Sequence, residues 1–172
     1  MINLDFAKLN LQDALDLAVL IEKEAEERYL EFVDRLGSRY KGDATEFFSL
    51  MARNEAIHGA ELAKRRKQLF GDAPSRVNED MISDVEAPEH TKPRDHMSPR
   101  HALDIAMESE VKAYEFFKKA LPSIKDAEVK KLFEELRDEE LEHQNLLKEQ
   151  MPKYPTSLHP DVDAEDIETP EL

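Results

Sequence analysis

The stretch "RNEAIHGAEL", Arg53 to Leu62, places Glu55 three residues before His58 in a segment with helical periodicity. The stretch "DEELEHQNLL", Asp138 to Leu147, repeats this spacing with Glu140 and His143. Because residues three or four apart share one face of an α-helix, each glutamate projects on the same side as its histidine. Whether that side faces solvent or the interior decides what fold and what site the sequence encodes.

Composition favours one mainly helical domain and excludes several kinds of site. The 172 residues include only 4 Gly and 9 Pro, with 37% charged and 40% hydrophobic residues. Without cysteine, the chain can form no disulfide and no thiolate metal site, so any metal must be held by oxygen and imidazole ligands. The net charge of -15 argues against nucleic acid and anionic membranes as partners. The N-terminus resembles no signal peptide and no apolar run could span a membrane, so we expect a cytoplasmic protein.

Helical periodicity and end signals predict four helices in a single domain over residues 1–151. The expected ranges are 11–36, 43–70, 99–120 and 126–150. Gly37 and Gly71 are placed to end the first two helices, with Gly37 expected in a left-handed conformation, while Ser98 and Asp126 can cap the last two. Residues 71–98 predict a long crossover, and residues 152–172 an acidic, flexible tail.

Two halves of the chain repeat each other. "ALDLA" at Ala14 to Ala18 returns as "ALDIA" at Ala102 to Ala106, and in each copy a glutamate follows eight residues after the first alanine, Glu22 and Glu110. The segments carrying the two glutamate and histidine pairs also align without a gap. The sequence therefore predicts an all-α four-helix bundle, made of two repeated antiparallel hairpins joined by the crossover.

The repeated polar residues interrupt apolar faces. On each expected helix, residues at alternating three- and four-residue spacing are apolar except for Glu22, Glu55, His58, Glu110, Glu140 and His143. Four ionised carboxylates in an apolar core require a counter-charge, and two divalent cations would supply it. Two glutamates plus two Glu-x-x-His motifs are the ligands of dinuclear carboxylate bundles. The alternative is a set of core polar residues that satisfy one another.

The sequence resembles the diiron domain of rubrerythrins and their ferritin-like relatives. The similarity rests on "IEKEAEERY" (21–29) with "NEAIH" (54–58), and on "SEVKAYEFF" (109–117) with "EELEH" (139–143). It implies that the ligands are Glu22, Glu55, His58, Glu110, Glu140 and His143, with Glu55 and Glu140 bridging the metals. Tyr29 matches a family tyrosine close to the cluster. A hydrogen bond or an electron-transfer role there and simple packing are equally open.

The resemblance implies two iron ions, for which manganese or zinc could substitute, and a non-haem diiron oxidoreductase that reduces peroxide or dioxygen. The cysteine-containing rubredoxin domain of typical rubrerythrins is absent, so a separate donor such as a rubredoxin-type protein would supply electrons. Ala113 replaces a glutamate that typical rubrerythrins carry. Ferroxidase activity in iron storage or handling is the first alternative, and a helical interaction protein with a structural metal site is the second. The family also implies a homodimer or larger homo-oligomer.

Overall fold

The computed structural model describes residues 5–37, 43–78, 81 and 97–154 of the chain. Its long helices are α1 (Leu11–Gly37), α2 (Asp43–Phe70), α3 (Pro99–Ala120) and α4 (Ala127–Gln150). Three short 3-10 helices accompany them: η1 (Phe6–Lys8), η3 (Leu121–Ser123) and η4 (Met151–Lys153). These described residues contain no strand. The predicted all-α, ferritin-like four-helix bundle is confirmed.

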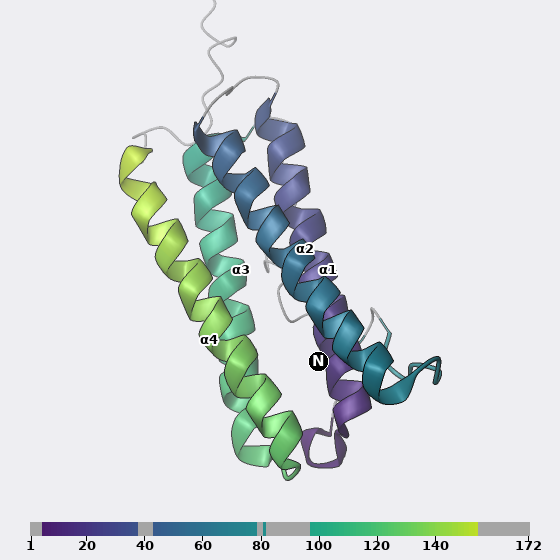
Figure 1. Ribbon diagram of the computed structural model, residues 1–172. Coiled ribbons are helices and arrows are strands. Elements are labelled where there is room, and N and C mark those ends of the chain that lie inside the picture. Colours follow the sequence, from purple (N-terminus) through teal and green to yellow (C-terminus); the bar gives the residue numbers. More distant parts are fainter. Residues whose placement is uncertain (1–4, 38–42, 79–80, 82–96, 155–172) are drawn as a thin grey trace, which may run out of the picture.

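The helices pair as two hairpins. In Figure 1, α1 lies antiparallel to α2 and α3 lies antiparallel to α4, with the two hairpins side by side and their axes roughly aligned. Residues 38–42 separate α1 from α2 and residues 121–126 separate α3 from α4, whereas residues 71–98 separate α2 from α3. Within the described ranges, no helix has the length and apolar character needed to cross a membrane.

Side-chain hydrogen bonds explain two helix starts, and a glycine explains one helix end. The Ser98 side chain accepts from the backbone N–H of His101 at the start of α3, and Pro99 takes the first helical position. At the start of α4, the Asp126 carboxylate accepts from the N–H groups of Glu128 and Val129. Gly71 has φ +59°, the left-handed conformation that a residue with Cβ rarely adopts, and it ends α2.

Two expectations about chain ends and turns are corrected. Gly37 is the last residue of α1 and does not take the left-handed conformation, which among the described glycines only Gly71 adopts. α1 therefore ends at Gly37 without a left-handed residue there, and residues 38–42 lie outside the described part. Residues 152 and 153, expected in the flexible tail, form the end of η4, and Tyr154 packs against the core. The rest of the predicted tail, 155–172, and residues 79–80 and 82–96 of the predicted crossover also lie outside the described residues.

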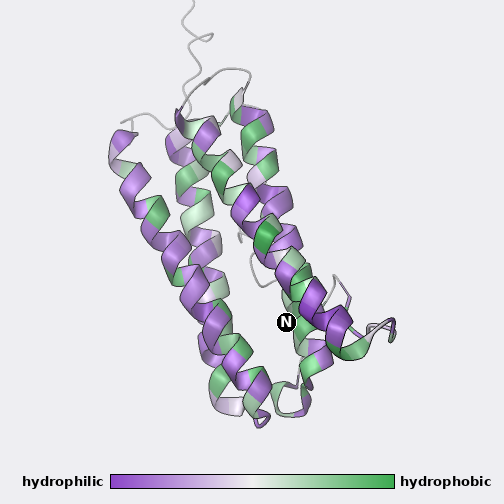
Figure 2. Ribbon diagram, viewed as in Figure 1, coloured by the Kyte–Doolittle hydropathy of each residue, from purple (hydrophilic) through white to green (hydrophobic). Residues whose placement is uncertain are grey.

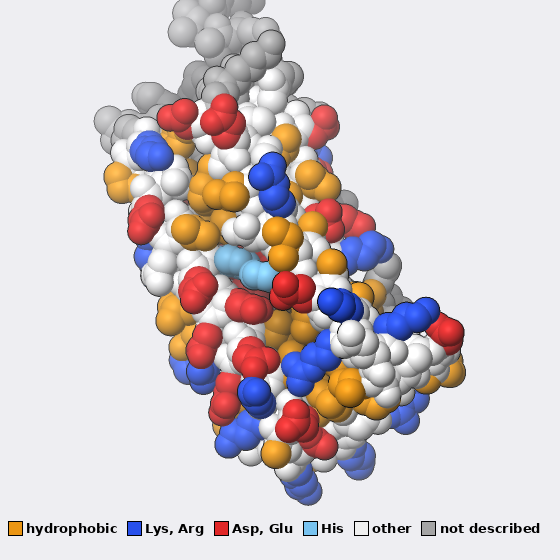
Figure 3. Space-filling view, viewed as in Figure 1, with side chains coloured by type: hydrophobic (Ala, Val, Ile, Leu, Met, Phe, Trp, Pro, Cys, Tyr) orange, Lys and Arg blue, Asp and Glu red, His pale blue; other side chains and the backbone are white. Residues whose placement is uncertain are grey.

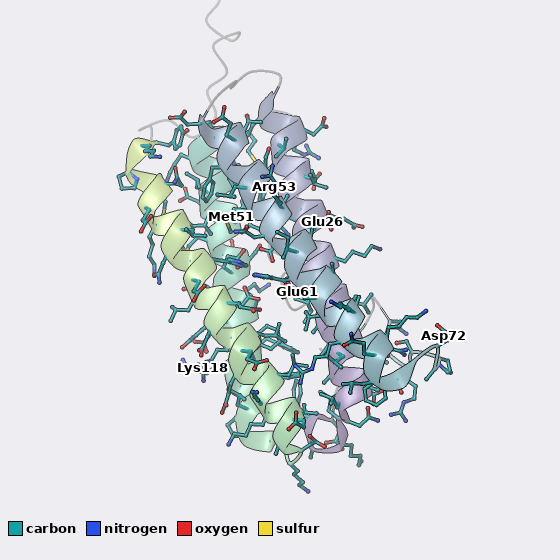
Figure 4. The ribbon with its side chains drawn as sticks, viewed as in Figure 1. Glu26, Met51, Arg53, Glu61, Asp72 and Lys118 are labelled. Atoms are coloured by element: carbon teal, nitrogen blue, oxygen red, sulfur yellow. The ribbon has the colours of Figure 1, made fainter. Side chains whose placement is uncertain are left out.

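The apolar core consists of two clusters, one toward each end of the bundle. One cluster contains Leu15 and Ile21 of α1 with Phe117 and Phe133. The other begins at Tyr29 of α1 and includes buried residues of α2 and α3, among them Met51, which points into the interior in Figure 4, where Glu26 points outward. Figure 2 shows the corresponding alternation of apolar and polar stretches along each helix. The predicted site residues lie between the two clusters, at the level where each helix passes from one to the other.

Candidate metal centre

Each long helix contributes to a polar layer in the middle of the bundle. Five of the six predicted ligands are buried, and the sixth, His58, is half-buried with 27% of its side chain exposed. The buried five are Glu22 on α1, Glu55 on α2, Glu110 on α3, and Glu140 and His143 on α4. Their positions follow from helical spacing, because each sits on the stripe that also carries the core residues of its helix. The structure therefore brings all six predicted residues together.

The second histidine lies close to carboxylates of two other helices. His143 Nδ1 is 3.2 Å from Glu55 Oε1 and 3.4 Å from Glu110 Oε2. On the other side, His58 Nδ1 is 3.9 Å from Glu22 Oε2. The two imidazole rings are nearly parallel, with centroids 5.7 Å apart. His143 thus has Glu110 as a neighbour and His58 has Glu22, which are equivalent positions in the repeat.

Three sets of potential donor atoms are tight enough to surround a cation. In each set the donor atoms lie within 4.8 Å of one another: Glu55, His58 and His143; Glu22, His58 and Glu139; and Glu110, Glu140 and His143. Glu55 reaches both histidines, which suits a carboxylate lying between two ions. Carboxylate oxygen and imidazole nitrogen together suit iron, manganese or zinc.

Two buried atoms that could bind a metal make no hydrogen bond. Glu22 Oε2 and His58 Nδ1 each lack one within the described residues. A buried polar atom without a partner costs free energy, so native structures pair nearly all of them. The two atoms are 3.9 Å apart, which is too long for a hydrogen bond and suitable for a shared cation. The residues present therefore fit a bound metal.

Ionisation in the metal-free site is strongly perturbed. The pKa of the Glu22 carboxyl is raised to about 7, chiefly by burial and also by the nearby charges of Glu139 and Glu110. A hydrogen bond with Glu55 and the charge of His143 oppose this rise. Burial also opposes the charged form of Glu110, but hydrogen bonds with His143, Glu140 and Tyr29 lower its pKa below the ordinary value. For His143, burial disfavours the imidazolium, yet Glu110 and other carboxylates raise its pKa.

Tyr29 contacts the site directly. Its side chain is buried, and its hydroxyl donates a hydrogen bond to Glu110 Oε1. The ring stacks on Phe48, with centroids 6.0 Å apart. Tyr29 therefore packs in the core and also donates a hydrogen bond to a predicted ligand. Both interpretations of this residue, packing and a hydrogen bond at the site, agree with the structure.

Sequence reasoning missed three residues beside the site. Glu139 joins Glu22 and His58 in one donor set. The Gln144 side-chain amide donates to the Glu110 backbone carbonyl at 3.3 Å. Gly59 lies so close to α1 that an added Cβ would be 3.3 Å from Glu22 Cβ. The spacing of Glu139 four residues before His143 was a usable signal, because residues four apart also share a helix face.

Solved structures of other proteins share this fold. A crystal structure of an uncharacterized conserved protein from Magnetospirillum magnetotacticum MS-1 superposes with a TM-score of 0.75 at 28% sequence identity, covering 88% of this chain and 100% of that one. A hypothetical protein from Pyrococcus furiosus shares the fold, with a TM-score of 0.58 and 24% identity over 90% of this chain and 100% of that one. No curated protein matches significantly.

The family comparison covers the whole polar layer. The model of the family described as Rubrerythrin matches residues 13–151, a range that includes all four long helices except the first two residues of α1. It thus contains every glutamate and histidine of the three donor sets. This chain belongs to the rubrerythrin family.

Proposed function

We propose that the protein is a non-haem diiron oxidoreductase that reduces hydrogen peroxide or dioxygen. The observation that carries the proposal is the convergence of four buried carboxylates and two imidazoles from four helices on one layer of the core. The family usually binds iron, and the donor set of this chain suits that metal. Manganese and zinc are substitutes that the same donors would accept.

The ligand roles follow from the two ends of the layer. Glu22 and His58 would hold one ion, Glu110 and His143 the other, and Glu55 and Glu140 would lie between them. When bound, two ferrous ions supply one electron each, enough with two protons to convert one hydrogen peroxide molecule to two water molecules. The apolar clusters on both sides of the layer limit water around the site.

Protons and electrons must reach the site by different routes. Tyr29 holds a proton on its hydroxyl at Glu110 Oε1, where it can stabilise the carboxylate or pass the proton on. Electrons would come from a separate protein of the rubredoxin type, because the chain has no cysteine with which to bind a rubredoxin iron. A homodimer or larger homo-oligomer is part of the same proposal.

The test is anaerobic reconstitution with Fe(II), metal analysis, and stopped-flow absorbance after mixing with peroxide or with oxygen. We expect two irons per chain and faster oxidation by peroxide than by oxygen. A Glu55→Ala and His58→Ala double variant should lose this iron, while Glu134→Gln, which changes another half-buried glutamate of α4, should keep it. Stoichiometric iron that neither peroxide nor oxygen oxidises would refute the activity, and absence of iron would refute the metal centre.

Iron oxidation for storage or transfer is the second candidate, and one feature favours it. His58 is partly exposed, and Figure 3 shows histidine side chains reaching the surface between α2 and α4 with acidic side chains beside them. Such a surface attracts cations. Oxidation mainly by oxygen, with iron uptake continuing beyond two per chain, would support this function over peroxide reduction.

A further inference from the structure

One of the donor sets contains a carboxylate that is not a predicted ligand. At one position the donor set is Glu110, Glu140 and His143, all of them predicted ligands. At the other it is Glu22, His58 and Glu139, and Glu139 belongs to no predicted ligand set. This glutamate is adjacent to Glu140 on α4 but reaches toward the other end of the layer.

The repeat shows that this carboxylate has no counterpart. When Glu140 is aligned with Glu55, Glu139 aligns with Asn54 of the first half. An asparagine amide is neutral, whereas an ionised carboxylate is an acceptor only and offers a full negative charge to a cation. Glu139 is thus an addition to one half of the duplicated site.

We propose that Glu139 is a metal ligand at the position of Glu22 and His58, where it makes the two metal positions chemically unequal. This inference rests on the proposed metal centre and adds one ligand to it. Glu139 would be the third ligand that binds this ion alone, after Glu22 and His58. Glu55 and Glu140, which would lie between the two ions, come in addition.

Helix geometry allows neighbouring glutamates to serve different ions. Glu139 is four residues before His143 and Glu140 is three residues before it, so both lie on the side of α4 that carries the imidazole. Their Cα positions differ by about 100° around the axis. One carboxylate is therefore directed toward Glu110 and the other toward Glu22, as the donor sets record.

The surroundings of Glu139 favour a bound cation over simple solvation. Its carboxyl is half-buried, within 4.8 Å of donor atoms of Glu22 and His58. Glu22 is itself more than nine-tenths buried, and its Oε2 atom makes no hydrogen bond within the described residues. Two carboxylates placed this close in a partly dry site repel each other unless a cation lies between them. A cation would remove that repulsion and give Glu22 Oε2 and His58 Nδ1 a partner.

The Glu139 position is also the more open one. The His58 side chain is 27% exposed, compared with 6% for His143. An ion there is nearer to solvent, and it is the one expected to exchange first. A third protein donor would compensate by holding it more tightly.

The experiment is a calorimetric titration of the full-length, metal-free protein with Co(II), with absorbance recorded in parallel to report the coordination of each ion. Wild type should bind two Co(II) per chain. Glu139→Gln keeps the side-chain shape but loses the charge, and we expect it to weaken one of the two ions at least tenfold, the lower limit typical of losing even a group that only supports a ligand. The matched control Glu134→Gln, half-buried on the same helix, should bind both ions within twofold of wild type.

A second variant identifies which ion is affected. His58→Asn should weaken the same ion, so that the Glu139→Gln and His58→Asn double variant still binds one Co(II) with wild-type affinity. Two ions with unchanged affinity and spectra in Glu139→Gln would overturn the inference and leave the proposed metal centre intact. Failure of wild type to bind Co(II), Fe(II) or Zn(II) would overturn both. If Glu139→Gln does not fold, Glu139→Asp, which shortens the carboxylate by one methylene, must show the same selective loss.

Discussion

Replacing Glu22 by glutamine should change how the stability of the metal-free protein depends on pH. Burial raises the pKa of this carboxyl from an ordinary 4.5 to about 7 in the folded protein. Between these two values the folded state keeps the proton and the unfolded state has lost it. Since the unfolded state then binds fewer protons, the free energy of unfolding falls as pH rises through this window.

The separation of the two pKa values sets the magnitude. A difference between 4.5 and about 7 corresponds to about 3 kcal/mol of lost stability when the pH passes both values. Glutamine has nearly the same shape and cannot ionise, so Glu22→Gln removes this loss. The raised pKa of His143 also lowers stability as pH increases above its ordinary 6.5. Glu110 and Glu139 raise this pKa in both proteins, and only the part that comes from the Glu22 charge is lost in Glu22→Gln. The difference between the two proteins therefore reports Glu22.

Urea unfolding of chelator-treated protein, followed by helical circular dichroism from about pH 4.5 to about pH 8, measures this difference. At the acidic end the two proteins should have similar stability, and at the alkaline end Glu22→Gln should be more stable by about 3 kcal/mol. Glu134→Gln should follow the wild-type curve. Parallel curves for wild type and Glu22→Gln would show that Glu22 is already ionised at pH 4.5 in the folded protein, which would refute the reasoning. Adding a divalent metal should reverse the order of stability, because only wild type retains the ligand.

Three further changes test the surroundings of the site and the fold. Tyr29→Phe removes the hydrogen bond to Glu110 but keeps the ring. The number of metal ions bound should stay at the wild-type value, while oxidation of reconstituted iron by peroxide, followed by stopped flow, should slow by about tenfold. An unchanged rate would mean that Tyr29 serves only in packing. Gly59→Ala would place a Cβ 3.3 Å from Glu22 Cβ, so we expect α1 and α2 to shift apart and the metal affinity, measured by calorimetry, to fall. Wild-type affinity would mean that the two helices adjust without moving Glu22. Asp126→Ala removes the carboxylate that accepts two backbone N–H groups at the start of α4, so the free energy of unfolding in urea should fall by about 1 kcal/mol. Metal binding should not change, and a weaker metal affinity would show that this helix end affects the site.

The bundle was predictable because its determinants are local and repeated. Stripes of apolar residues mark the buried face of each helix, and Ser98, Gly71 and Asp126 mark helix ends with residues that have specific backbone roles. The duplicated hairpins then supply long-range information that one sequence rarely contains, since they require Glu55 and Glu140 to occupy equivalent places. Gly37 was misassigned because glycine permits a left-handed turn without requiring one.

What the sequence did not predict depends on distances across the bundle. Glu139 and Glu140 both lie near the face of α4 that carries His143, and helical spacing alone does not distinguish them, whereas the repeat selects only Glu140. The link between Gln144 and the Glu110 carbonyl, like the close approach of Gly59 to Glu22, depends on how near two helices lie. The residue spacing within one helix carries no information about the distance between two helices.

The duplication makes the ligands alike and leaves their surroundings different. Tyr29, which bonds Glu110, corresponds in the repeat to Phe117, which has no hydroxyl to offer Glu22. The Glu110 end of the layer therefore has a hydrogen-bond donor that stabilises an ionised carboxylate, and that carboxyl has a lowered pKa. At the Glu22 end the pKa is raised and a half-exposed histidine faces the surface. In the peroxide reduction that we propose, the two ends of the layer would therefore differ in charge and in the supply of protons to the substrate.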